Sequence, residues 1–113
     1  RWSRGLGDVY KRQHVTTGGV WTNASSRELK QNIAGLSVAE AETALMQLQP
    51  VTFNYRSERS EDYVGFIAED VPELVATGDR QSLSAMDIVA VLTKVVQQQQ
   101  QRIEELEARL DAQ

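Results

Sequence analysis

Residues 88–110 read IVAVLTKVVQQQQQRIEELEARL, and they contain the clearest structural pattern in the chain. Apolar residues recur here in steps of three and four, which is the spacing of a helix that packs against other helices. This spacing predicts one long helix with a coiled-coil seam over about residues 85–112. The heptad positions are a at Val89, Val96, Ile103 and Leu110, and d at Leu92, Gln99 and Leu106.

The seam is narrow, and this favours a partner helix over packing of the long helix on its own domain. The residues around the seam are mostly polar, so they offer no broad apolar face to a core. Arg102 falls at position g and Glu107 at the next e, which attract each other between parallel helices. Val or Ile at a with Leu at d favours two chains, and Gln99 perturbs that preference without replacing it.

Upstream of this helix, the sequence predicts a shorter helix. Ser37 and Glu40 have the spacing of a capping box, so a helix begins near Val38. Pro50 ends it, because the residue before a proline avoids the helical conformation. An apolar stripe runs along this helix at Ala41, Leu45 and Leu48.

Two β-rich stretches follow, VTFNYRS at residues 51–57 and YVGFIAED at residues 63–70. The polar stretch ERSED separates them, so we expect a hairpin or two neighbouring strands. EDVPEL predicts a short helical turn, and Gly78-Asp79 a loop before a capping box at Ser84 and Asp87. The expected fold class is α+β, with a core that includes Phe53, Tyr55, Val64, Phe66 and Ile67.

The first thirteen residues, RWSRGLGDVYKRQ, fit no fold pattern. Back-translation of GDVYKRQ resembles the mosaic end of a transposon-based sequencing-library adapter, and SRGLG continues the adapter in the same frame. We therefore interpret residues 1–13 as translated adapter and exclude them from fold reasoning. Residues 14–24, HVTTGGVWTNA, then predict a strand end or a linker from an upstream region that is expected to be missing.

The composition excludes several classes of function. Without residues 1–13, the 12 basic and 16 acidic residues fall to eight and fifteen, a net charge of about −7. An acidic domain is a poor candidate for binding nucleic acid or anionic membrane by bulk charge. The chain has no cysteine and a single histidine, His14, so we expect no disulfide, no metal site and no cofactor. No apolar run approaches membrane-spanning length, and a chain this short is expected to form one domain.

The stretch NASSRELKQNI, residues 23–33, has two interpretations. Ser25 and Glu28 have capping-box spacing, which predicts Ser25 as the N-cap of a helix and Lys30 as a surface charge. The second interpretation is a serine nucleophile with a lysine base. In a continuous helix Ser25 and Lys30 would lie about 140° apart around the axis. They can meet only if Ser25 lies outside the helix and folds back.

Four stretches together resemble the peptidase S74 domain, the C-terminal intramolecular chaperone of phage tail spikes and fibres typified by endosialidase. They are SSRELKQNI (25–33), LQPVTFNY (48–55), VGFIAEDVPELV (64–75) and LSAMDIVAVLTKVVQQQQQRIEELEARL (83–110). The family pattern is Ser-(Asp or similar)-x-x-Leu-Lys-x-x-Ile. Ser25, Leu29, Lys30 and Ile33 match it, and Ser26 stands where Asp is frequent.

The resemblance implies a specific biology. Such domains form homotrimers, guide the folding of an upstream fibre or spike segment of the same chain, and then cut themselves off. The implied catalytic dyad is Ser25 and Lys30, and the implied cleavage site is the Ala24–Ser25 bond, with Ser26 as the alternative nucleophile. The long helix would be the parallel trimeric coiled coil. The resemblance places the chain in the host cytoplasm during assembly and its parent protein in the virion tail.

The chemistry needs a lysine that has lost its proton. The ordinary lysine pKa of about 10.4 keeps the amine charged at neutral pH, and burial or a nearby positive charge lowers it. Arg27 and a helix start near Lys30 could act in this way, and backbone N–H groups there could stabilise an oxyanion. Two other interpretations stay open at this point. The domain could be a non-cleaving trimerisation cap or, less in keeping with its β segments, a coiled-coil adaptor.

Overall fold

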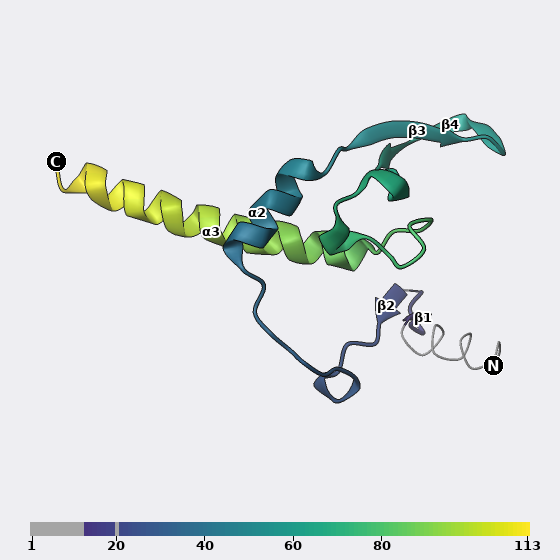
Figure 1. Cartoon of the computed structure of the whole chain (residues 1–113), viewed down its shortest axis with the longest axis horizontal. Coiled ribbons are helices and arrows are strands. Elements are labelled where there is room, and N and C mark those ends of the chain that lie inside the picture. Colours follow the sequence, from purple (N-terminus) through teal and green to yellow (C-terminus); the bar gives the residue numbers. More distant parts are fainter. Residues whose placement is uncertain (1–12, 20) are drawn as a thin grey trace. The chain divides into compact units, whose positions relative to one another are not determined.

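A computed structural model describes residues 13–19 and 21–113 of the chain. It contains two compact units, one that ends at Gly35 and one that runs from Leu36 to Gln113. The described elements are labelled in Figure 1. They are β1 (Gln13–Val15), β2 (Trp21–Asn23), η1 (Arg27–Leu29), α2 (Val38–Gln47), β3 (Val51–Tyr55), β4 (Glu58–Gly65), η2 (Ala68–Asp70), η3 (Glu73–Val75) and α3 (Ala85–Asp111).

In the first unit, the segment between the interpreted adapter and the candidate site is a short antiparallel hairpin. Strand β1 pairs with β2 in the register Gln13 to Asn23 and Val15 to Trp21. Gly19 lies in the turn with a φ of 84°, a conformation that glycine adopts without the steric cost of a side chain. The strand end expected over residues 14–24 is therefore a small hairpin. Of the interpreted adapter, residues 1–13, only Gln13 is among the described residues.

In the second unit, α2 begins and ends where the sequence predicts. The Ser37 hydroxyl accepts a hydrogen bond of 3.1 Å from the Glu40 backbone N–H, which satisfies one donor of the first turn. The helix ends at Gln47, three residues before Pro50. Its buried side chains are Ala41 and Ala44, and their small size allows α2 to lie close to α3.

The core of this unit is small and lies where α2, α3 and the residues around η3 meet. The buried residues all have aliphatic side chains, and Val75 and Ala41 are fully inaccessible to water. Leu36, Leu45, Leu48, Phe66 and Ala76 pack around them and are partly buried. The buried set is Ala41, Ala44, Val71, Val75, Ile88, Val91 and Val95.

Strands β3 and β4 form the predicted hairpin, but its turn is not where the sequence placed it. The polar stretch ERSED at residues 58–62 is part of β4, and the turn is Arg56-Ser57. The strand pairing runs from Val51 with Gly65 to Tyr55 with Glu58. The polar residues fit a strand because this part of β4 is exposed to water, so nothing there demands apolar side chains.

The aromatic residues of the hairpin pack on one another and not in the buried core. The ring centroids of Tyr55 and Tyr63 lie 5.3 Å apart. The Phe53 ring centroid lies 5.3 Å from that of Tyr55 and 5.8 Å from that of Tyr63. A Cβ at Gly65 would lie 3.2 Å from the Phe53 ring, so glycine makes room for that ring. The prediction that Tyr55, Val64 and Ile67 are core residues is wrong, because all three are exposed.

The loop before α3 is held by the side chains of Arg80, Asp79 and Thr77. The Arg80 guanidinium donates to the carbonyls of Glu69 and Val71 at 3.4 and 3.0 Å, and pairs with the Glu73 carboxylate at 2.6 Å. Asp79 accepts from the Gln81 N–H and the Thr77 hydroxyl, both at 3.0 Å, and these bonds lower the pKa of its carboxyl. The predicted turn at Gly78-Asp79 is confirmed, and the loop ends where Ala76 bridges Leu83.

The long helix α3 has two different apolar faces. Ile88, Val91 and Val95 are buried and face α2 and η3, so the helix does pack on its own domain. The predicted seam residues lie one position further along the chain, about 100° around the axis. Val89, Leu92 and Val96 are exposed, although each directly follows a buried residue in the sequence. Ser84 is the N-cap residue, as predicted, but its side chain makes no capping hydrogen bond.

Candidate functional site

The residues of the Ser-Lys pair lie on either side of one short 3-10 turn. This turn, η1, begins after Ser26, whose carbonyl accepts from the Leu29 N–H at 3.0 Å. The Ser26 hydroxyl accepts from the Glu28 N–H at 3.3 Å. The prediction that Ser25 is the N-cap residue is therefore wrong by one position. Ser26 takes that place, and Ser25 lies outside the turn.

The turn brings the two candidate catalytic atoms together. The Lys30 Nζ donates a hydrogen bond to the Ser25 Oγ at 2.5 Å. Lys30 is the C-cap residue that follows the turn. Its N–H is bonded to the Arg27 carbonyl at 3.1 Å, and its own backbone is extended. Because the helix is not continued through these residues, the angular separation that kept Ser25 and Lys30 apart in a regular helix does not apply.

The pair is open to water in the single chain. Ser25 and Lys30 are both exposed, and Ala24 on the other side of the candidate bond is half-buried. Leu29 and Ile33, the two apolar residues of the motif, are 69% and 56% exposed. Withdrawal from water favours the neutral form of an amine. Within the described residues, this chain alone does not withdraw the Lys30 amine from water.

The charges around the pair come from its own turn. The ion pairs within residues 13–19 and 21–113 are Arg80 with Glu73 and Arg102 with Glu105, so neither involves Lys30. Arg27 and Glu28 are exposed neighbours in sequence. In chemical terms, this site offers a hydroxyl nucleophile beside an amine, next to the peptide bond that precedes the hydroxyl.

The predicted seam residues have no partner in the described part of one chain. Val96, Ile103 and Leu110 are exposed to 60%, 48% and 69%, and Gln99 is exposed as well. A shallow apolar groove of about 310 Å³ lies over this face of α3. Its lining residues are Val89, Leu92, Thr93, Val96 and Gln97.

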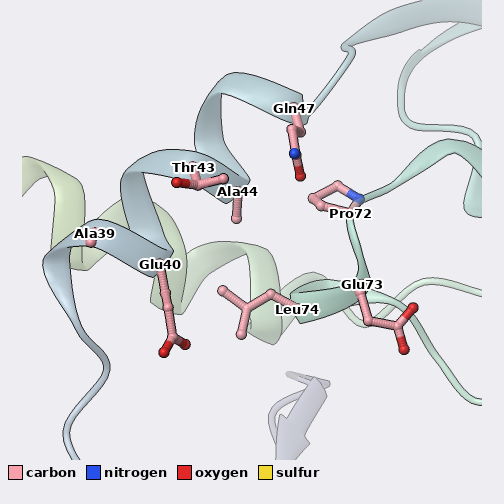
Figure 2. Close-up of a pocket in the computed structure, with 8 residues that line it drawn as sticks. All are labelled: Ala39, Glu40, Thr43, Ala44, Gln47, Pro72, Glu73 and Leu74. Atoms are coloured by element: carbon pink, nitrogen blue, oxygen red, sulfur yellow. The ribbon is translucent and has the colours of Figure 1, made fainter.

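A second groove lies between α2 and η3 and has no catalytic arrangement. Figure 2 shows Leu74 reaching toward α2 between the side chains of Glu40 and Glu73. Its volume is about 330 Å³, and the Glu73 carboxylate is already paired with Arg80. The carboxylates of Glu69, Asp70 and Glu73 are exposed, as predicted. The groove is lined by Ala39, Glu40, Thr43, Ala44, Gln47, Pro72, Glu73 and Leu74.

The described residues include neither a metal-binding cluster nor a membrane-spanning helix. No group of three or more His, Cys, Asp or Glu side chains there is arranged to hold a metal ion. Among these residues, no helix combines the length and the apolar character that crossing a membrane requires.

Comparison with known proteins identifies the family of the segment that contains the pair. Residues 25–78 match the family model Peptidase_S74, described as the chaperone of endosialidase. The resemblance inferred from the sequence motifs is therefore confirmed. The matched segment begins at Ser25 and ends before α3. No curated protein and no solved structure matched the chain.

Proposed function

We propose, on the premise that residues 25–78 are a chaperone-of-endosialidase segment, that this protein is a self-cleaving intramolecular chaperone. It assembles as a homotrimer through α3, assists the folding of a phage tail fibre or spike segment upstream in the same chain, and then releases itself. The observation that carries the proteolytic part is the 2.5 Å separation of Lys30 Nζ and Ser25 Oγ. That separation suits proton transfer between the two groups.

The proposed reaction begins when the neutral Lys30 amine takes the proton of the Ser25 hydroxyl. The Ser25 Oγ then attacks the carbonyl carbon of Ala24, and the C–N bond between Ala24 and Ser25 breaks. The Lys30 ammonium returns its proton to the departing Ser25 nitrogen, which leaves an ester between Ala24 and the Ser25 side chain. Lys30 then takes a proton from water as the water oxygen adds to the ester carbon, the bond from that carbon to Ser25 Oγ breaks, and the Lys30 ammonium gives its proton to Oγ. The products are a carboxylate at Ala24 and a chain that begins with Ser25.

The nucleophile and the peptide bond that it attacks are adjacent in the same chain. No separate substrate has to bind to bring them together. One turnover per chain is sufficient for release. The exposure of Lys30 in the single chain suggests how the reaction is delayed. If trimer assembly covers Lys30, the amine loses its proton only after the chains are in register. The fibre would then be aligned before its guide is removed.

The test is intact mass spectrometry of the chain during incubation after purification. We expect fragments of residues 1–24 and 25–113, a full-length product for Ser25→Ala, and continued cleavage for Ser26→Ala. Cleavage of Ser25→Ala together with full-length Ser26→Ala would move the nucleophile by one residue.

A second candidate function is a trimerisation cap that does not cleave. The exposed seam on α3 favours assembly whether or not the peptide bond is cut. A wild-type chain that is trimeric by light scattering and full-length by mass spectrometry would select this second function. In that case the uncleaved domain would stay attached to the end of the fibre in the virion.

A further inference from the structure

The two adjacent serines of the site have different hydrogen-bond partners. The Ser25 hydroxyl is bound to Lys30 at 2.5 Å, and the Ser26 hydroxyl accepts from the Glu28 N–H at 3.3 Å. A serine hydroxyl that accepts from the backbone two residues later is acting as an N-cap. We infer that Ser26 is a positioning residue, whose hydroxyl holds the η1 turn in the shape that brings Lys30 back to Ser25.

The inference follows from how little else holds the turn. η1 contains three residues, and none of them is buried, so packing contributes little to its shape. Its hydrogen bonds are those from Leu29 to Ser26, from Lys30 to Arg27, and from Glu28 to the Ser26 hydroxyl. Only the last bond depends on a side chain. Without it, the Glu28 N–H loses its protein acceptor and the turn opens more readily.

The chemistry of N-caps gives this role a signature that differs from that of a nucleophile. Asparagine, aspartate and serine are about equally good N-cap residues, and alanine is a poor one. Asparagine has no hydroxyl and no charge. Ser26→Asn should therefore keep the turn without offering a second nucleophile or a carboxylate beside Lys30.

This inference rests on the proposed self-cleavage, and the first measurement is the cleavage rate of three versions of the whole chain. We expect Ser26→Asn to cleave within about twofold of wild type, and Ser26→Ala to cleave about fivefold more slowly, as the loss of an N-cap predicts. All three should be cut between Ala24 and Ser25. Equal rates for Ser26→Ala and wild type would overturn the inference. Loss of cleavage in both variants would overturn it too, because the hydroxyl itself would then be required.

The matched control is Ser37→Ala. Ser37 is also an N-cap, with its hydroxyl 3.1 Å from the Glu40 N–H, but it begins α2 and not the site. We expect this variant to unfold at a lower temperature and to cleave at the wild-type rate well below that temperature. A rate reduction equal to that of Ser26→Ala would mean that loss of any cap slows the reaction, and would count against a specific role.

A second measurement separates this inference from the proposed function. Nuclear Overhauser contacts between the Ser25 Hβ and Lys30 Hε protons report the turn, whether or not the bond is cut. We expect them in wild type and Ser26→Asn, and a marked loss in Ser26→Ala. If the wild type is never cleaved, the proteolytic proposal fails while this pattern still supports the positioning role. Unchanged contacts in Ser26→Ala would reject the positioning role alone.

Discussion

At the scale of single residues, the proposed self-cleavage needs a base as well as a nucleophile. Lysine can give up its proton when it is withdrawn from water, whereas the arginine guanidinium stays protonated at any pH a folded protein tolerates. A substitution that keeps the charge of residue 30 while removing its basicity therefore separates an electrostatic role from a proton-transfer role.

We expect Lys30→Arg to be uncut over times in which the wild type is fully cleaved, because the guanidinium cannot take the Ser25 proton. The measurement is intact mass spectrometry over time. Lys94→Arg makes the same substitution on α3 and should cleave normally. Cleavage of Lys30→Arg at the wild-type rate would show that residue 30 acts only through its charge.

The small core makes a second prediction at this scale. Val91 is 2% exposed and Val64 is 81% exposed, so the same change can be made inside and outside the core. We expect Val91→Ala to lower the free energy of unfolding by roughly 2 kcal/mol, because it leaves a cavity as well as losing buried methyl groups. Val64→Ala should change it by less than about 0.5 kcal/mol. Urea unfolding followed by circular dichroism gives both values, and equal losses would mean that Val91 is not a core residue in solution.

At the scale of elements, α3 has a buried face and an exposed apolar face. Its first half is held to α2 by Ile88, Val91 and Val95, and its second half contains no buried residue. An isolated helix of that length is marginal in water, because most helix stability in proteins comes from packing. We therefore expect the second half to be well ordered only when the seam is covered by other chains.

The seam can be tested by placing charge in it. Ile103→Asp with Leu106→Asp should give a monomer in light scattering, because two unpartnered carboxylates would be buried in the assembled seam. If assembly is what withdraws Lys30 from water, the same protein should stay uncut despite an intact Ser25. Efficient cleavage by a proven monomer would show that the pair works within one chain.

The matched control adds the same charge on the other side of the helix. Gln101 and Ala108 both fall at heptad position f, away from the seam. Gln101→Asp with Ala108→Asp should therefore assemble and cleave like the wild type. A monomeric control would mean that added negative charge, and not the seam, decides assembly.

At the scale of the whole molecule, acidity sets what the protein can bind. Outside residues 1–13, acidic residues outnumber basic ones by fifteen to eight. Binding to duplex DNA gains much of its free energy from basic side chains that release counterions, and this chain lacks such an excess. We expect no gel shift of duplex DNA by micromolar protein at physiological salt. A gel shift at that concentration would contradict this expectation and would mean that basic side chains gather on one part of the surface.

The sequence predicted those features that depend on residues close together in the chain. The Ser37 cap, the hairpin and the start of α3 follow from local spacing, and the pairing of Ser25 with Lys30 follows from the family resemblance. Features decided by the surroundings were missed. The S-x-x-E spacing selects Ser25, because Glu28 stands three residues after it. The 3-10 turn instead uses the Ser26 hydroxyl, which accepts from an N–H only two residues later, so the spacing pointed to the wrong serine. The polarity of ERSED predicts a loop, but these residues form part of an exposed strand, which tolerates polar side chains.

The packing of α3 on α2 was missed for a related reason. Between Ile88 and Val96 the helix is apolar on most sides, so a heptad pattern can be drawn through Val89 and Leu92 while Ile88 and Val91 also face a core. Periodicity shows that such a helix has apolar faces. It does not show which face belongs to the same chain, because that depends on where α2 lies.

The Ser-Lys pair is built from residues five positions apart, and this has a consequence for the order of events on the ribosome. A turn so local closes in well under a millisecond, long before synthesis reaches Ala85 at the start of α3. A newly made chain would thus carry the pair in place while α3, the helix proposed to align three chains, is still untranslated. If the chain releases itself as proposed, the timing of that release cannot come from forming the pair. It has to come from a slower step that follows translation.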